Sequence, residues 1–137
     1  MQKTEYSSEI LFRGKNEKGE YVEGDLIHTQ DVFENNETYI FSQTTPSKWQ
    51  QHRIPDTETI GRFTGYIYNT KKVYENDRIF CDSLYGIIRY GRYRSEFDSP
   101  KTEHCGFYVE WIGIGNSYLR KDLGYWLNEN VTIKRED

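Results

Sequence analysis

The chain is organised around two short runs, Ile60-Gly61-Arg62-Phe63-Thr64-Gly65-Tyr66 and Val73-Tyr74-Glu75-Asn76-Asp77-Arg78-Ile79-Phe80. Both runs mix aromatic and β-branched residues with turn-forming residues, and neither is long enough for a capped helix. Asn76 and Asp77 stand just before an apolar segment, where their side chains can bond their own backbone and tolerate left-handed dihedral angles. The stretch therefore predicts a strand, a turn, a tight turn and a second strand.

We expect this stretch to fix the scaffold and not to form an active site. Four apolar side chains should be buried, and Gly65 should have a positive φ or a backbone packed against its Cα. The four side chains are those of Phe63, Tyr74, Ile79 and Trp111. The full structural signature comprises Gly61, Phe63, Gly65, Tyr74, Asn76, Asp77 and Trp111.

The same residues resemble the signature of the YopX family of phage and prophage proteins. The central pattern of that family is similar to Ile60–Gly65 and Val73–Ile79. Its opening pattern is similar to Phe12–Ile27, and its closing pattern is similar to Glu110–Asn116. The matches span about residues 10 to 116, with Asn76 in place of the usual glycine. The resemblance implies a mostly β protein of mobile-element origin, and it implies no catalytic residues.

The size of the chain bounds its organisation. A length of 137 residues allows one domain, or one domain plus a small lobe. We expect a loose polar segment over residues 1–9, the family-like β region over 10–116 and a C-terminal extension over 117–137. The content of 12 tyrosines and 7 phenylalanines suits pleated, half-buried surfaces. The net charge of −4 gives no general attraction to nucleic acid or anionic membranes.

The cysteines and the apolar runs indicate the compartment. Cys81 and Cys105 show no Cys-x-x-Cys spacing, and the N-terminus lacks the pattern of a signal peptide. No apolar run reaches the roughly 20 residues needed to span a bilayer. We therefore expect a cytoplasmic protein whose thiols are free.

Alternating polarity predicts short strands with turns about every ten residues. Ile10–Lys15 and Glu20–His28 should form a hairpin, and Cys105–Ile114 is the strongest strand pattern. Thr44–Arg53 is predicted to be a long polar loop around Pro46. We expect a mainly β fold, a small antiparallel barrel or sandwich, with at most one short helix. Its C-terminal half should contain an SH3-like β-barrel portion.

Residues with catalytic or metal-binding chemistry are few. Cys81, His104 and Cys105 are three potential metal ligands, but they lack the close cysteine pair of structural zinc sites. A further set consists of the carboxylates Glu23, Asp25, Glu75 and Asp77, which beside turns are usually solvated. No nucleophile motif or phosphate-binding loop is present in the sequence. We therefore expect no enzyme activity, no cofactor and no metal.

The strongest binding signal is a short segment in which arginines alternate with tyrosines. The candidate binding residues are Arg89, Tyr90, Arg92, Tyr93 and Arg94, together with Trp49 in the polar loop. Exposed tyrosine and arginine are enriched at protein interfaces. We therefore expect an accessory protein of a phage or prophage that forms a homo-oligomer or contacts a host or phage protein. The alternative is nucleic-acid binding, because such a strand can stack bases and hold phosphates.

Overall fold

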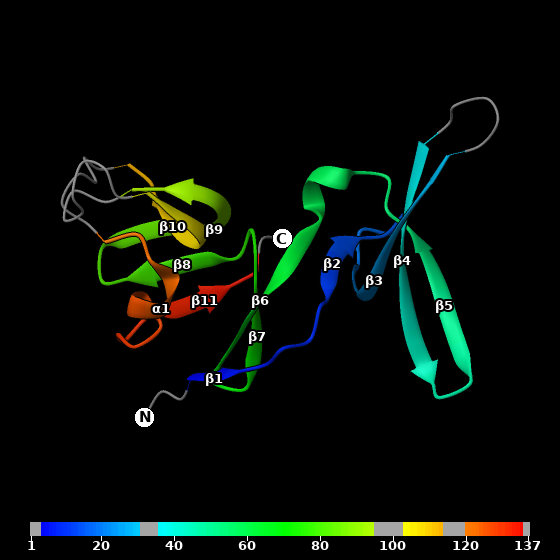
Figure 1. The fold of residues 1–137 in the computed structure, drawn as a ribbon, viewed down its shortest axis with the longest axis horizontal. Helices are drawn as coiled ribbons and strands as arrows, with labels where there is room; N and C mark the ends of the chain where they lie inside the picture. The colour runs from blue at the N-terminus through cyan, green and yellow to red at the C-terminus, as the bar shows by residue number, and fades with distance from the viewer. Residues whose placement is uncertain (1–3, 31–35, 95–102, 114–119, 136–137) are drawn as a thin grey trace. The chain divides into compact units, whose positions relative to one another are not determined.

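The computed structural model describes residues 4–30, 36–94, 103–113 and 120–135. Its contacts divide the chain into two compact units. The first unit is Ser8–Phe63, and the second unit combines Met1–Ser7 with Thr64–Asp137. Antiparallel strands dominate both units (Figure 1), so the predicted mainly β class is confirmed.

The strands are β1 (Thr4–Tyr6), β2 (Phe12–Lys15), β3 (Tyr21–Gln30), β4 (Asn36–Thr45), β5 (Lys48–Arg53), β6 (Gly61–Tyr68), β7 (Lys71–Tyr74), β8 (Arg78–Cys81), β9 (Leu84–Tyr93), β10 (His104–Trp111) and β11 (Thr132–Lys134). A single 3₁₀ turn, η1 (Thr57–Thr59), and a short helix, α1 (Leu123–Trp126), complete the described elements. The expectation of at most one short helix is confirmed for the described residues.

The first unit is an antiparallel sheet in the order β2-β3-β4-β5, with the start of β6 on the other side of β2. The predicted hairpin is confirmed, and Gly19 in its turn has φ +77°. Strand β3 changes partner after Gly24, from β2 to β4. A Cβ on Gly24 would lie 2.0 Å from the carbonyl oxygen of Phe41, so only glycine fits where β3 passes β4.

The predicted loop over Thr44–Arg53 is wrong, because most of it is strand. Strand β4 continues to Thr45, Pro46 and Ser47 form the turn, and β5 pairs back along β4 with a bulge between Gln43 and Thr45. Only His52 in β5 is even half-buried. Because neither face of β5 is buried, apolar residues are not required at every second position. The resulting polar sequence has the composition of a loop.

The second unit contains the four-stranded sheet β10-β9-β8-β11 and the remaining part of β6 with β1 and β7. Its core is a cluster of apolar residues from the sheet and from the α1 region: Tyr68, Val73, Ile79, Ile88, Val109, Trp111, Leu123, Trp126, Leu127 and Val131. The indole N–H groups of Trp111 and Trp126 both donate to the carbonyl oxygen of Arg120, at 3.0 and 2.8 Å. A carbonyl oxygen has two lone pairs, so this one acceptor satisfies both buried donors.

The signature residues are buried as predicted. The exposed fractions are 6% for Phe63, 2% for Tyr74, 0% for Ile79 and 3% for Trp111. The predicted turn is also confirmed, since Asn76 has φ +78° and the buried Asp77 carboxylate accepts from the Tyr74 amide at 2.8 Å. The signature therefore holds a turn between core strands.

The N-terminal segment differs from expectation at Thr4–Tyr6, which forms β1 and pairs with Tyr66–Tyr68 of β6. The hydrogen bonds of this pairing are formed by backbone groups, so the pairing requires no apolar side chains in the N-terminal segment. The sequence predicts a strand from Ile87 to Tyr93, whereas β9 begins earlier, at Leu84, after a turn at Asp82 and Ser83. The sequence also predicts a turn at residues 34–37, a polar loop at 94–104 and a helix cap at Ser117. Asn36, Glu37 and His104 belong to strands instead, and residues 34–35, 95–102 and 117 lie outside the described residues.

Gly65 has φ +87°, as predicted, and a Cβ at this position would lie 3.2 Å from the carbonyl oxygen of Ser7. We expect Gly65→Val to lower the free energy of unfolding by about 1–2 kcal/mol, because a side chain disfavours left-handed dihedral angles. Gly65→Asn should cost less, since asparagine tolerates this region. Urea unfolding of both variants measures the difference, and equal stability of Gly65→Val and the original chain would contradict the assigned conformation.

Candidate functional site

The predicted Arg/Tyr segment lies on β9, which pairs with β10 along its length. Arg89 is opposite Tyr108, and Tyr93 is opposite His104. Because side chains alternate along a strand, Arg89 and Tyr93 share one face of the sheet, while Tyr90 and Arg92 belong to the other. The structure therefore divides the predicted binding residues between two faces.

Tyr93 is stacked between two other rings on its face of the sheet. Its centroid lies 5.1 Å from that of His104 and 5.1 Å from that of Tyr108, with interplanar angles of 23° and 25°. On the opposite face, Tyr90 packs edge to face on Phe107 at 4.9 Å. Both sides of the Tyr93 ring are already covered, so this ring is not a free platform for a nucleic-acid base.

The arginines of β9 lie beside carboxylates. Arg89 Nε is 3.3 Å from Glu110 Oε2, and its Nη1 donates to Asn76 Oδ1 at 3.1 Å. Arg92 Nε is 3.5 Å from Glu103 Oε1, although 82% of the Arg92 side chain is exposed. Arg94 is exposed. The neighbouring carboxylates reduce the positive potential that phosphate binding requires, which weakens the nucleic-acid interpretation of this strand.

One edge of β10 is covered only in part. The Val109 amide donates to the carbonyl oxygen of Lys121 at 2.8 Å, and Tyr108 forms a bridge with Asp122. Since backbone groups alternate between the two edges of a strand, Cys105 directs its N–H and C=O the same way as Val109, away from β9. In the described part of the chain, His104–Gly106 pairs with β9 alone. Among the described residues, no strand therefore covers the outward-facing backbone of β10 at Cys105.

The three potential metal ligands do not come together. Cys81 is opposite Leu84, and Cys105 is opposite Arg92, which places them eight positions or about 26 Å apart along β9. His104 is on β10 beside Cys105, with its ring on Tyr93. Both cysteines are free, and burial raises the pKa of the Cys81 thiol, which favours its protonated form.

The acidic set is also dispersed. Glu23 and Asp25 are exposed on β3 of the first unit, whereas Glu75 and Asp77 belong to the turn of the second. Asp77 is buried and binds the Tyr74 amide, so its carboxylate stabilises the turn. Among the described residues, no group of three or more His, Cys, Asp or Glu side chains is arranged to hold a metal ion.

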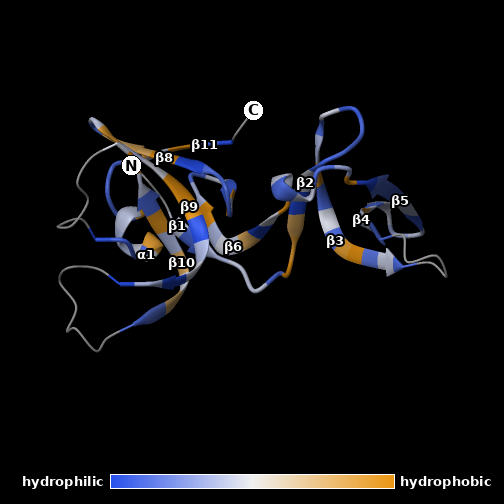
Figure 2. Cartoon of the chain, turned by 90° about the horizontal axis from the view of Figure 1, so that it is seen from above, coloured by the Kyte–Doolittle hydropathy of each residue, from blue (hydrophilic) through white to orange (hydrophobic). Residues whose placement is uncertain are grey.

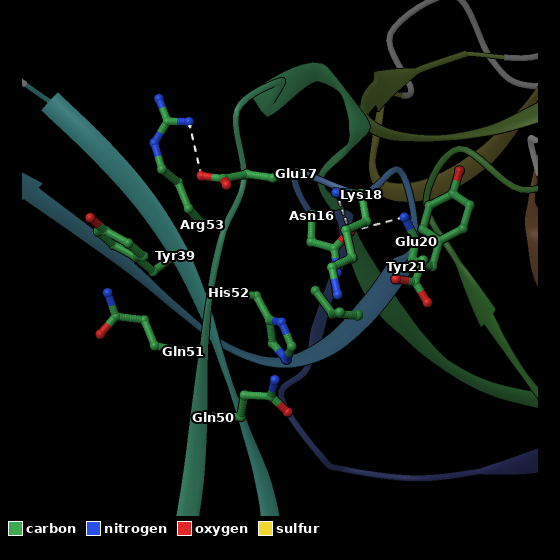
Figure 3. Close-up of a pocket in the computed structure, with 11 residues that line it drawn as sticks. Asn16, Glu17, Lys18, Glu20, Tyr21, Tyr39, Gln50, Gln51, His52 and Arg53 are labelled. Carbon is green, nitrogen blue, oxygen red and sulfur yellow. Dashed lines mark hydrogen bonds and ion pairs between the residues drawn. The ribbon is translucent and has the colours of Figure 1, made fainter.

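The first unit carries a hollow of about 650 Å³, within the range of protein ligand sites. It is open to solvent on one side and is lined by polar side chains from the β2–β3 turn and from β5 (Figure 3). The lining residues are Asn16, Glu17, Lys18, Glu20, Tyr21, Val22, Tyr39, Gln50, Gln51, His52 and Arg53. We call this space the β5 groove.

Hydrogen bonds organise both walls of the β5 groove. Asn16 Oδ1 accepts from the backbone amides of Lys18 and Glu20, each at 3.0 Å, which fixes the turn. Arg53 Nη1 lies 3.4 Å from Glu17 Oε1, so an ion pair joins the end of β5 to that turn.

The Tyr39 hydroxyl donates to the Glu37 carboxylate. This hydrogen bond raises the pKa of Tyr39, because a phenolate would face a negative charge. Arg53 Nε lies 3.7 Å from the same carboxylate. Tyr39 thus stays a neutral hydrogen-bond donor. The Arg53 guanidinium is shared between the carboxylates of Glu37 in β4 and Glu17 in the turn.

Trp49, predicted as a binding residue, is on β5 opposite Gln43 and is 56% exposed. It does not line the β5 groove. Figure 2 shows β5 as hydrophilic over much of its length, so Trp49 is an exposed aromatic residue in polar surroundings. Its exposure agrees with a contact surface, while its binding role stays a prediction.

Sequence reasoning did not identify the β5 groove. Its residues come from the β2–β3 hairpin, from Tyr39 of β4 and from β5, and none forms a known motif. The available signals were the turn sequence Asn16-Glu17-Lys18-Gly19 and the amide pair Gln50-Gln51 after a proline-containing turn. Only the sheet pairing shows that the two segments face each other.

Comparison of the chain with known protein families, curated proteins and solved structures finds no match. No helix in the described ranges is long and apolar enough to cross a membrane.

Proposed function

We propose that the chain is a protein-interaction module that self-associates through the outer end of β10. The observation that carries this proposal is the edge at His104–Gly106, where Cys105 directs its backbone groups outward and no strand of the described residues covers them. Free strand edges pair readily with another chain, and a second copy presents the same edge. The exposed residues Tyr90 and Arg92, on the neighbouring strand β9, are of the types enriched at interfaces.

The wider setting follows from the sequence resemblance. The YopX-like signature supports an accessory protein of phage or prophage origin that acts in the cytoplasm, by binding rather than catalysis. The dispersion of the cysteines, of His104 and of the acidic residues supports a non-enzymatic role. Host or phage proteins are the further partners that this setting offers.

The test is light scattering at tens of micromolar, where we expect an oligomer. Cys105→Pro removes the outward N–H without removing a bond to β9 and should give a monomer. Cys105→Ser keeps the N–H and should remain oligomeric. A monomeric original chain, or an oligomer that survives Cys105→Pro, would contradict self-association through this edge.

Nucleic-acid binding is the alternative, favoured by the 82% exposure of the Arg92 side chain. It predicts an affinity for single-stranded DNA or RNA that falls steeply as salt rises. It also predicts that replacing Arg89, Arg92 and Arg94 abolishes this binding. Such a result in a monomeric protein would replace the self-association proposal.

A further inference from the structure

We propose that the β5 groove binds an extended, uncharged segment of another polypeptide, which adds to β5 as a strand. This site lies in the first unit and uses none of the residues of the β10 edge. The proposal stands on three features: the direction of the backbone groups of β5, the position of the groove along its edge, and the balance of charge inside it.

The backbone of β5 has a free edge on the side away from β4. The Ile54 amide donates to the carbonyl oxygen of Thr38 at 2.9 Å, so Ile54 points toward the β4 side. Because direction alternates along a strand, Gln51 and Arg53 direct their N–H and C=O groups away from β4. Within the described ranges, β5 pairs with no strand other than β4.

The β5 groove runs along this edge and not over one face of the sheet. Four consecutive residues of β5 line it, although consecutive side chains point to opposite faces. Figure 3 shows Gln51 and Arg53 with Tyr39 on one side of the strand, and Gln50 and His52 on the other. A space bordered by both sets of side chains must border the backbone between them, where an added strand would form its hydrogen bonds.

The shape of the β5 groove selects a single extended chain as its occupant. Its far wall is the turn at Asn16–Glu20, which the Asn16 side chain holds and which Arg53 reaches through Glu17. If two copies of the chain paired symmetrically through β5, the Asn16–Glu20 turn of each copy would obstruct the approach of the other copy's β5. A narrow, extended segment avoids this obstruction, which excludes a second copy of the β4–β5 hairpin.

The charges of the β5 groove select an uncharged segment. The carboxylates of Glu17 and Glu20 balance the cations Lys18 and Arg53, so the lining has no net charge. Arg53 already lies beside two carboxylates. The remaining polar groups include amides and neutral hydroxyls, which can accept or donate hydrogen bonds without a charged partner. A charged side chain entering the β5 groove beside Arg53 would lose hydration without gaining an unshared counter-charge.

The probe is a set of acetylated, amidated peptides of about six residues, matching the length of β5, built from Thr, Val, Ser, Gln and Tyr. Two matched sets carry Glu or Lys at alternate positions, and a third carries N-methyl groups on alternate backbone amides. We expect binding by members of the uncharged set. Affinity should fall about tenfold or more after N-methylation, since backbone hydrogen bonds are lost.

Variants of the protein separate backbone from side-chain recognition. Gln51→Pro removes an outward N–H and leaves the β4 ladder intact, so it should reduce affinity about tenfold or more. Gln51→Ala keeps this N–H and loses only the side-chain amide, so it should bind the peptides more tightly than Gln51→Pro. Amide chemical-shift changes on peptide addition should fall on residues 16–22 and 48–53.

The proposal would be overturned if no peptide of the uncharged set bound, or if the N-methylated or charged peptides bound equally well. It would also be overturned if Gln51→Ala and Gln51→Pro lost equal affinity, or if the amide chemical-shift changes were confined to the second unit. The Cys105→Pro variant separates this site from self-association. It should be monomeric and still bind the peptides, and loss of peptide binding in that variant while it remains folded would count against two independent sites.

Discussion

Trp111→Ala is expected to lower the free energy of unfolding by about 3–5 kcal/mol, the range for deleting a large buried aromatic side chain. Trp111 is 3% exposed, and its ring meets Trp126 edge to face at 4.8 Å. The substitution leaves a cavity and removes one of the two donors to the Arg120 carbonyl. Urea unfolding should show a midpoint lowered by about 2 M, given a slope of about 2 kcal/mol per molar.

Trp49→Ala is the matched control, because it removes the same side chain from a position that is 56% exposed. It should change stability by about 0.5 kcal/mol or less, as surface substitutions generally do. If the two tryptophan variants unfolded at the same urea concentration, the assignment of Trp111 to the core would be wrong.

Gly24→Ala should cost about 3 kcal/mol, at the upper end of the usual cost of overpacking. The added Cβ would lie 2.0 Å from the Phe41 carbonyl oxygen and 2.8 Å from its carbon. Both atoms belong to the backbone of β4, which cannot move aside without breaking its pairing with β3 and β5. Thermal unfolding monitored by far-ultraviolet circular dichroism measures the loss.

Gly14→Ala provides the comparison in the same unit, since a Cβ there would meet only side-chain atoms, at 3.2–3.4 Å. Side chains can give way by a few tenths of an ångström, so we expect a smaller effect than at Gly24. A Gly24→Ala variant as stable as Gly14→Ala would show that β3 and β4 do not approach as described.

The buried strands were predictable from sequence because burial on one face leaves a mark at every second position. Phe107, Val109 and Trp111 alternate with polar or less buried neighbours, and this alternation located β10. The turn at Asn76 and Asp77 was predictable because its chemistry is local. In contrast, β1 pairs with a strand distant in sequence and β5 with its hairpin neighbour β4, and both are held by backbone pairing, which leaves no such pattern in their own side chains.

The candidate sites were less predictable, for the same reason. The composition of Arg89–Arg94 indicated a binding strand, but the carboxylates of Glu103 and Glu110 come from the neighbouring strand segment. Their effect on the arginines depends on the register of β9 and β10. The β5 groove needs the pairing of β4 with β5 and the position of the β2–β3 turn, which no single segment encodes.

The pair formed by Trp111 and Trp126 gives the second unit an optical signature. Two indole rings with centroids 4.8 Å apart and planes inclined by 72° are close enough for their electronic transitions to couple. Such coupling produces a pair of circular-dichroism bands of opposite sign, and Trp49, which belongs to the first unit, is not a member of this pair. The loss of these bands on heating therefore follows the melting of the second unit.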